Sequence, residues 1–481
     1  MNITVNVEID KSAITNFEEL VSNIRNQMLK AGQEVMREIL ERTDECLRVE
    51  RDTKVYREKG IRKTTVKTLL GDIEYKRRIY EDLRCPEKST YVYLLDEALG
   101  IEKVGLIGKD VSAQAVSMIC ETSYRETAAA LTKLTGTQIS HQGVWNLIQK
   151  VGRKQKEQIA RHAVLAKKGK HVGVIDTKLL YEENDGIYLK LQGREQKKEH
   201  QSSKEMKIGI AYTGAVWQGK APYRRYLDNK LAYASFEGAD AFRKNKEGLI
   251  GSRFNLDEID MRIINGDGAG WVTTSSASCE KVRVLDKFHR NRKITECVKD
   301  PEFARTVRQL LMVEKNIPLL LDVLEGQVNS LENEDEKEKM QELYTYFQEN
   351  QDILLNPYER EIAVPETIAP GTIHHARLGS MESNVFTLVG NRMKGRRRTW
   401  SVAGGNNLAL LICLKKTVGF EHLFTEAEEE EEWVDTGNPL ATREAMKRIG
   451  KGYEYYQSSR SIYGWMRDIM SNVSAVDLVL R

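Results

Sequence analysis

Four apolar runs of the type that forms β-strands follow one another between residues 172 and 289, and this succession most constrains the fold. They are HVGVIDTKLLYEENDGIYLKLQG (171–193), KIGIAYTGAVW (207–217), MRIINGDGAGW (261–271) and KVRVLDKFH (281–289). The first run is interrupted by Asn184-Asp185-Gly186, residue types that predict a turn. The third run ends in a Gly-Asp-Gly-Ala-Gly turn. A β-sheet is therefore expected in the middle of the chain.

Helical patterns follow these strands. Leucines recur at helical spacing from about 301 to 355, residues 379–401 indicate a helix that leads into a basic loop, and residues 404–416 indicate a buried helix. Strands, then a long helical interruption, then further helices around a few carboxylates suggest an α/β nuclease core with a helical insertion.

The carboxylates of this α/β region stand where a metal ion and a phosphate could approach. Asp267 ends an apolar strand between two glycines, although Asp-Gly is also common in ordinary turns. Asp185 has a similar Asp-Gly setting, and Asp176, inside a β-type run, is the alternative to it. Glu382 starts a helix, where a carboxylate also interacts favourably with the helix dipole.

Three carboxylates of this kind suit phosphoryl transfer on DNA. Mg²⁺ and Mn²⁺ are hard cations that prefer oxygen ligands. Two such ions about 4 Å apart can activate the attacking oxygen and stabilise the leaving one. We therefore expect Asp185, Asp267 and Glu382 to be metal ligands.

Two further features flank these carboxylates. Asp286 and His289 form a D-x-x-H pair on the strand after Asp267, either assisting the site or including a structural histidine. The segment after Glu382 is basic, which predicts contacts with DNA phosphates, or simply an exposed loop. Its basic residues are Arg392, Lys394, Arg396, Arg397 and Arg398.

The N-terminal part has a helix and a basic hairpin. Residues 13–50 have apolar residues at helical spacing. TTVKTLLGDIEYKRRIY (64–80) predicts two strands joined at Gly71-Asp72. The hairpin is either an ordinary solvated one or a DNA contact. In the second case the candidates are Lys76, Arg77 and Arg78.

A helix-turn-helix is predicted next. Ser123 and Glu126 form a capping box, Gly136 is a C-terminal stop, and Ser140 caps a second helix. Two short helices joined in this way can place the second one in a major groove, although helical hairpins are also common in packed cores. The candidate base readers are His141, Gln142 and Asn146.

Composition narrows the class of protein without identifying a partner. The 481 residues include 74 Lys and Arg against 71 Asp and Glu, a formal charge of +3. No stretch approaches the roughly 18 apolar residues of a membrane span, and no secretory signal is visible. The six cysteines are scattered, as in reduced thiols. We therefore expect a cytoplasmic protein of two or three domains that has no membrane partner.

The chain resembles transposases of the ISLre-two family of bacterial insertion sequences over nearly its whole length. Of the segments that carry this resemblance, the most specific is GSMESNV with NRMKGRRRTWS (379–401). In that family a small residue followed by Met and Glu occurs together with a downstream R-M-K and W-S. The segments are TLLGDIEYKRRIY (68–80), SYRE (123–126), YEENDGIYLKLQ (181–192), NGDGAGW (265–271), VLDKFHRNRKI (284–294) and GSMESNV with NRMKGRRRTWS (379–401).

The resemblance implies a DDE-type site on a ribonuclease H-like core, with Asp185, Asp267 and Glu382 as the metal-binding triad. The family usually has Ala where this chain has Asn184, so Asp176 stays open as the first carboxylate. The D-x-x-H pair is similar to one in Mutator-like transposases, in which an inserted helical domain precedes the catalytic Glu.

The predicted activity is cleavage at insertion-sequence ends and strand transfer into target DNA, with Mg²⁺ or Mn²⁺ as cofactor. The partner is double-stranded DNA, bound by a homo-oligomer in the nucleoid. The alternatives are a DNA nuclease or resolvase, and a DNA-binding regulator with an inactive site. The expected domains are an N-terminal helix (1–60), a DNA-binding region (61–165), a core in two parts (166–299 and 371–425), a helical insertion (300–370) and a C-terminal tail (426–481).

Overall fold

A computed structural model gives the fold of the chain, and its described part falls into two compact units. Unit 1 ends at Ile148 and unit 2 begins at Gln149. The acidic run expected as a linker at Glu426 and Glu428–Glu432 lies outside the described residues. The structure describes residues 16–84, 90–101, 107–170, 172–193, 202–218, 224–272, 279–360, 362–365, 378–395 and 397–419.

Unit 1 begins with the expected helix and hairpin. Helix α1 (Phe17–Glu50) lies along a three-stranded antiparallel sheet of β1 (Tyr56–Thr68), β2 (Gly71–Asp82) and β3 (Thr90–Val92). The hairpin prediction is confirmed, but the chain reverses at Leu69-Leu70, because Thr68 already pairs with Gly71. The core between helix and sheet contains Leu40, Val66, Ile73, Tyr75 and Leu95.

The predicted helix pair is also present. Helix α2 (Leu94–Leu99) and α3 (Lys109–Ile119) precede α4 (Tyr124–Thr135), whose capping box has both hydrogen bonds. Gly136 ends α4 with φ +77°, as predicted. Helix α5 (His141–Lys167) is 27 residues long, so the second helix is not short, and the border between the units falls inside it.

Unit 2 is built on a five-stranded mixed sheet, which confirms the expected α/β fold. The strands are β4 (Leu179–Lys190), β5 (Ser203–Tyr212), β8 (Leu231–Ser235), β9 (Met261–Gly266) and β10 (Glu280–Leu285). Their spatial order is β10-β9-β4-β5-β8. Strands β4, β5 and β8 pair antiparallel, whereas β9 and β10 run parallel to β4. A separate ribbon pairs β6 (Gly214–Gln218) with β7 (Arg224–Asp228).

The turn predicted at residues 184–186 is wrong, because β4 continues through these positions without a break. Each of these residues pairs with β5. Gly186 fits because a Cβ there would lie 2.3 Å from the Glu205 carboxylate. The side chain of Asn184 is satisfied by Lys246, whose Nζ donates to its Oδ1 at 2.8 Å. Tertiary partners therefore hold turn-forming residue types in a strand.

Strand β4 presents alternate residues to the two faces of the sheet. Glu182 and Asn184 face α7 (Ala239–Gly251), where Lys246 contacts both. Glu183 and the residues that alternate with it face the opposite side, which is covered by α12 (Met381–Val385) and the π-helical turn η6 (Phe386–Gly390). Carboxylates of the same strand thus lie in two separate environments.

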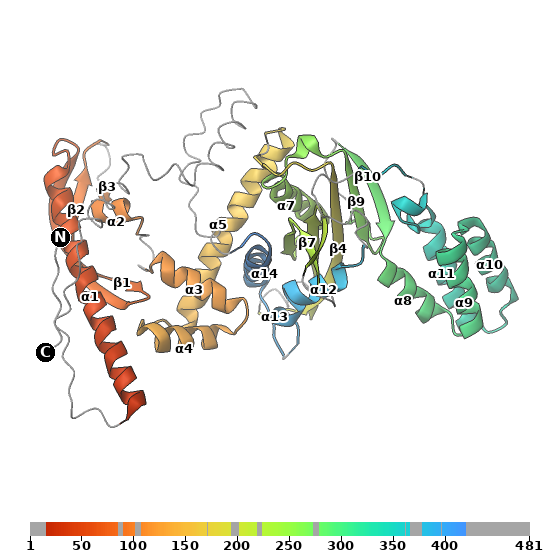
Figure 1. The fold of residues 1–481 in the computed structure, drawn as a ribbon, viewed down its shortest axis with the longest axis horizontal. Helices are drawn as coiled ribbons and strands as arrows, with labels where there is room; N and C mark the ends of the chain where they lie inside the picture. The colour runs from red at the N-terminus through yellow and green to blue at the C-terminus, as the bar shows by residue number, and fades with distance from the viewer. Residues whose placement is uncertain are drawn as a thin grey trace. The chain divides into compact units, whose positions relative to one another are not determined.

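Helices follow β10, and the helical block predicted from about residue 301 to 355 is present. The strand predicted over 281–289 is wrong beyond Leu285, because a helix begins at Lys287. In Figure 1, α9, α10 and α11 pack side by side, with Leu311, Leu324 and Phe347 in their shared core. The helices are α8 (Lys287–Cys297), α9 (Pro301–Gln309), the π-helical turn η3 (Leu310–Glu314), α10 (Ile317–Ser330) and α11 (Glu334–Glu349).

The last described segment returns to the sheet. After α12 and η6 come the short α13 (Asn391–Met393), a basic loop and the buried helix α14 (Val402–Thr417), as predicted from the sequence. Short 3-10 turns lie at Leu256–Glu258, Gln351–Ile353 and Pro357–Arg360. Helix α14 contacts β8 at the edge of the sheet. Within the described ranges, no helix has the length and apolar character needed to cross a membrane.

Candidate active site

Strand register brings three aspartates to one end of the sheet. Glu183 of β4 is opposite Asn265 of β9, so two residues further on Asp185 and Asp267 reach the same level and the same face. Gly266 is opposite Leu285 of β10, which places Asp286 next to them. This end of β9 and β10 is their carboxyl end, where α/β sheets usually bind ligands.

His289 lies among these aspartates. The expectation that Asp286 and His289 both lie on a strand is wrong, because Asp286 is the N-cap of α8 and accepts from the backbone N–H groups of Phe288 and His289. His289 Nε2 is 3.5 Å from Asp185 Oδ1. This contact raises the pKa of His289, against the lowering effect of burial, and Asp286 and Asp267 contribute to the rise.

Asp267 is half-buried in the turn that follows β9. Its Oδ1 accepts from the backbone N–H of Ala269 at 2.9 Å, and its carbonyl accepts from the Tyr346 hydroxyl at 3.3 Å. Gly268 has φ +93°, and a Cβ there would lie 2.9 Å from Asn350 Oδ1. The glycine therefore permits the tight turn that fixes the Asp267 carboxylate.

The other candidate for the first carboxylate lies at the far end of the strand. Asp176 precedes β4, and its Oδ1 accepts from Asn255 Nδ2 at 2.6 Å. The start of β4 is level with Met261, the first residue of β9, whereas Asp267 follows the last. The geometry therefore favours Asp185 over Asp176 as the neighbour of Asp267.

Glu382 is not brought into the aspartate group. Its side chain is exposed on α12, and its charge makes a small contribution to the raised pKa of Arg292 on α8. Among the described residues, no set of three or more His, Cys, Asp or Glu side chains is grouped closely enough to hold a metal ion. The carboxylate oxygens of Asp185 and Asp267 fit Mg²⁺ or Mn²⁺ in chemistry, while the third ligand stands apart.

A buried carboxylate that sequence reasoning missed lies beside Asp185. Glu183 is fully buried and accepts hydrogen bonds from Tyr212, Asn265 and the backbone of residues 379 and 380. Burial raises its pKa, against the lowering effect of these donors. Its signal in the sequence is its spacing, because residues two apart on a strand share a face.

Hydrogen bonds join Glu183 to the aspartates. Asn265 Nδ2 lies 3.0 Å from Glu183 Oε2 and 2.9 Å from Asp286 Oδ2. One amide therefore connects the carboxylate on β4 with the cap of α8, next to His289.

The predicted basic cluster after Glu382 divides into buried and exposed members. Arg392 is buried with its guanidinium 5.4 Å from the centre of the Trp400 ring, so its role as a phosphate contact is not supported. Arg398 donates to the carbonyls of residues 391 and 392. Lys394 and Arg397 are exposed, and Arg396 lies outside the described residues.

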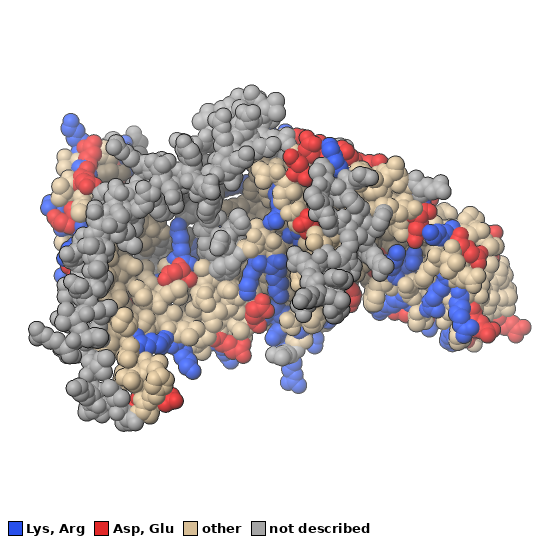
Figure 2. Space-filling model, in the orientation of Figure 1, with Lys and Arg blue, Asp and Glu red and all other residues tan. Residues whose placement is uncertain are grey.

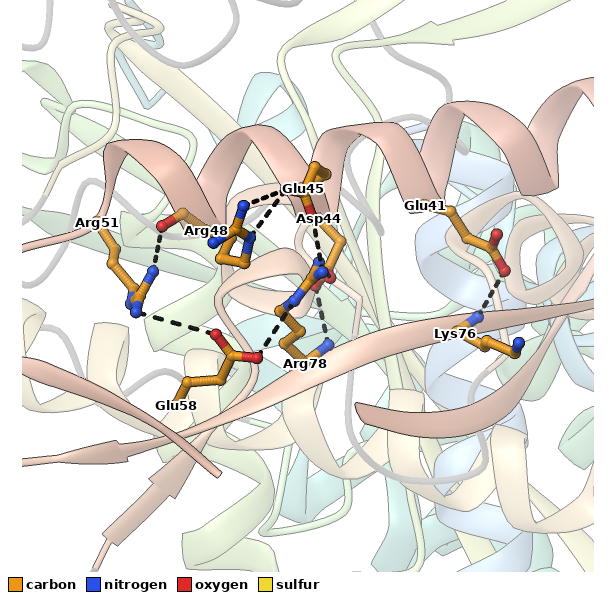
Figure 3. Close-up of polar contacts among 8 residues, drawn as sticks. All are labelled: Glu41, Asp44, Glu45, Arg48, Arg51, Glu58, Lys76 and Arg78. Atoms are coloured by element: carbon orange, nitrogen blue, oxygen red, sulfur yellow. Dashed lines mark hydrogen bonds and ion pairs between the residues drawn. The ribbon is translucent and has the colours of Figure 1, made fainter. Parts of the chain in front are cut away.

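The basic residues predicted on the hairpin are largely occupied inside unit 1. Arg77 is buried, paired with Asp96 and stacked 3.8 Å from the centre of the Tyr93 ring. Only Lys76 has an exposed side chain, while its backbone N–H donates to Glu41. Figure 3 shows Arg78 held by acidic residues of α1 and β1, which are Asp44, Glu45 and Glu58. Arg77 and Arg78 are therefore engaged in contacts within unit 1, and their contact with DNA stays a prediction.

The start of α5 offers an exposed polar surface. His141, Gln142 and Asn146 are exposed, and Gln142 Nε2 donates to Asn146 Oδ1 at 3.1 Å. Trp145, with 38% of its surface exposed, lies beside them. Ser140 caps the helix through Gly143. These residues can reach a partner without any change in the core.

Charge on the helical insertion is mixed. On the face drawn in Figure 2, Lys and Arg side chains lie beside Asp and Glu side chains over α9 to α11. That face of the insertion is therefore not a single-sign surface of the kind that tracks a phosphate backbone.

The fold and this strand edge define an α/β protein with an aspartate-lined end to its central sheet. The chain belongs to the Uncharacterised protein family (UPF0236), whose model matches residues 11–430. It is similar to the UPF0236 protein TTE2489 of Caldanaerobacter subterraneus subsp. tengcongensis, with 26% identity over 81% of this chain and 80% of the relative. A UPF0236 protein in the vanSb 3'region of Streptococcus gallolyticus is 24% identical over 87% and 88% of the two chains. A further relative from Caldanaerobacter, 25% identical over 81% of this chain and 79% of its own length, bears eleven designations in its name, from TTE0033 to TTE2212.

Proposed function

We propose that this chain is a DNA transposase that cleaves insertion-sequence ends and transfers the freed strand into target DNA. The observation that carries the proposal is the register of β4 and β9, which brings Asp185 of β4 level with Asp267 just after β9, with His289 against Asp185. Paired carboxylates at a strand end suit two-metal phosphoryl transfer.

The strand order supports a ribonuclease H-like core for this activity. Numbered along the chain, the five strands lie in the order 3-2-1-4-5, with the first three antiparallel and the last two parallel to the first. This is the strand arrangement of ribonuclease H-like proteins. The helices α9 to α11 stand between the last strand and the segment that carries Glu382, as the resemblance to transposases implies.

The family adds a second line of support. The relative with eleven designations in one organism fits a sequence present in many copies, as expected for a mobile element. A nuclease of the host or a regulator would not need such repetition. The other proposals, a resolvase and an inactive regulator, therefore rank below the transposase.

The residues of the candidate site and its surroundings then have the following roles. Mg²⁺ or Mn²⁺, when bound, would supply the charge that activates the attacking oxygen and stabilises the leaving one. Asp185 and Asp267 would hold the ions, and Glu382, which stands apart from them in this structure, would be the third ligand once it reaches them. His289 orients the Asp185 carboxylate. Exposed Lys394 and Arg397 neutralise phosphates, and the start of α5 reads base edges in a major groove.

The test is cleavage and strand transfer on DNA that carries the element's own ends, with Mn²⁺ or Mg²⁺. We expect joined products from the wild type and a loss of at least roughly 100-fold in the Asp267→Asn variant. Asp176→Asn is the matched control, because this carboxylate lies at the opposite end of β4, and it should stay active. Equal activity of wild type and Asp267→Asn would refute the site. Cleavage without joining would favour the nuclease, and binding alone the regulator.

A further inference from the structure

Glu183 collects hydrogen bonds from three separate segments of the chain. Tyr212 of β5 donates to it at 2.8 Å and Asn265 of β9 at 3.0 Å. The backbone N–H groups of Gly379 and Ser380 donate at 2.8 Å and 3.1 Å. A fully buried carboxylate is costly unless its oxygens are satisfied, so these donors are required for the fold.

The position of Glu183 connects two parts of the candidate site. It lies two residues before Asp185 on the same face of β4, and its backbone donors lie two and three residues before Glu382. Gly379 has φ +108°, a conformation that L side chains rarely adopt. Glycine therefore allows the chain to turn so that both N–H groups point at one carboxylate.

A second contact holds the other end of the same short helix. Lys230 Nζ donates to Asn384 Oδ1 at 3.2 Å, and Asn384 Nδ2 donates to the carbonyl of Ser380 at 2.8 Å. Helix α12 is thus fixed at its start by Glu183 and near its end by Lys230. Its orientation on the sheet, and with it the position of Glu382, depends on these anchors.

We propose that Glu183 is a positioning residue, which anchors the segment that carries Glu382 to the strand that carries Asp185. Through this anchor it sets where Glu382 starts from relative to Asp185 and Asp267, the residues that would hold the metal ions. The inference rests on the proposed function. Partners of this kind behind a ligand typically change metal affinity or activity by about 10–100-fold when they are removed.

The neighbouring residue provides a matched control. Glu182 is also fully buried on β4 but faces the opposite side of the sheet. Its carboxylate pairs with Lys246 at 2.7 Å and Arg262 at 3.3 Å. Glu182→Gln therefore removes a buried charge from the same strand without touching the segment before Glu382.

The experiment compares the full chain with Glu183→Gln, Gly379→Ala and Glu182→Gln by two measurements. Amide hydrogen exchange follows the peptide that covers residues 379–385, and electron paramagnetic resonance of free Mn²⁺ gives the Mn²⁺ affinity. We expect Glu183→Gln to speed exchange in this peptide and weaken Mn²⁺ binding about 10–100-fold. Gly379→Ala should act in the same direction with the carboxylate retained. Glu182→Gln should lower the unfolding temperature and leave both measurements unchanged in the folded protein.

Two outcomes overturn the inference. Unchanged exchange and Mn²⁺ affinity in Glu183→Gln would show that the segment is held without this residue. An equal loss in Glu182→Gln would show that any buried charge change on β4 has the same effect. A wild type that binds no Mn²⁺ and cleaves no DNA would instead refute the proposed function and the role of the anchor in metal binding. If exchange is then faster in Glu183→Gln, Glu183 holds the segment in place but has no role in metal binding.

Discussion

Arg77 and Asp96 form a buried ion pair in unit 1, with 8% and 2% of their side chains exposed. The Arg77 guanidinium also lies over the ring of Tyr93. Removing one member of a buried pair leaves the other charge without compensation, which typically costs about 3–5 kcal/mol. The side chain of the adjacent Lys76 projects into solvent. Two neighbouring basic residues on one strand therefore have different roles.

We predict that Arg77→Gln lowers the free energy of unfolding of unit 1 by about 3–5 kcal/mol. Lys76→Gln should change it by less than about 0.5 kcal/mol, because exposed substitutions away from special features are nearly neutral. Urea unfolding followed by native-state hydrogen exchange at β2 amides measures both. Similar stability for the two variants would contradict the buried pair.

Part of this difference could be read from the sequence. Ile73, Tyr75 and Arg77 have the same parity on β2, so Arg77 belongs to the apolar face, and Lys76 to the other. The pairing of this face with α1, and of Arg77 with Asp96, depends on tertiary contacts that spacing does not give. The same holds for Glu183, whose donors at residues 379 and 380 are distant in sequence.

At the scale of elements, local signals predicted caps and hairpins well. The capping box at Ser123 and the hairpin before Asp82 depend on neighbours in sequence, and both are present. The break predicted at Asn184 failed because Lys246, 62 residues away, satisfies its side chain inside a strand. The strand predicted over 281–289 does not extend to Asp286, which caps α8 instead. This capping role depends on where α8 begins, which the residue pattern does not give.

Glu237, after β8, allows a pH test of how these elements are joined. Its carboxylate accepts from Lys156 of α5 at 2.6 Å and from Asn245 of α7 at 2.9 Å. Burial alone would raise the pKa of Glu237, but the hydrogen bonds from Lys156 and Asn245 outweigh it and lower the pKa below 4.5. A carboxylate whose folded pKa is lowered stabilises the protein above its unfolded pKa and loses that effect as pH falls.

We predict that Glu237→Gln destabilises unit 2 by about 1–2 kcal/mol at pH 7, the typical contribution of hydrogen bonds to a charged group. The difference from wild type should stay constant down to about pH 4.5 and shrink below it, as the wild-type carboxylate is protonated. Urea unfolding at pH 7 and pH 3.5 measures this. Lys156→Gln should show the same reduced pH dependence, and a difference that grows at low pH would contradict the assignment.

At the scale of the whole molecule, the candidate metal ligands all lie in unit 2, while the exposed start of α5 lies in unit 1. The α/β class followed from the succession of apolar runs. The order and direction of the strands could not be predicted, because they depend on which strands pair. The pairing of β4 with β9 alone makes Asp185 and Asp267 neighbours. Sequence spacing therefore indicated candidates, and register decided which of them are neighbours.

This division leads to a prediction about metal binding. A ligand that binds only the folded protein stabilises it by about 2.7 kcal/mol at 100 times its dissociation constant. If Asp185 and Asp267 hold the ions, excess Mn²⁺ should raise the free energy of opening of the slowest-exchanging amides in β4 and β9 by about 2.7 kcal/mol. Hydrogen exchange at these amides then becomes about 100-fold slower. The amides of β1 and β2 in unit 1 should not respond. Native-state exchange with Mn²⁺ and with a chelator makes the comparison. Asp267→Asn should abolish the protection, and protection that persists in this variant, or that appears in unit 1, would place the metal elsewhere.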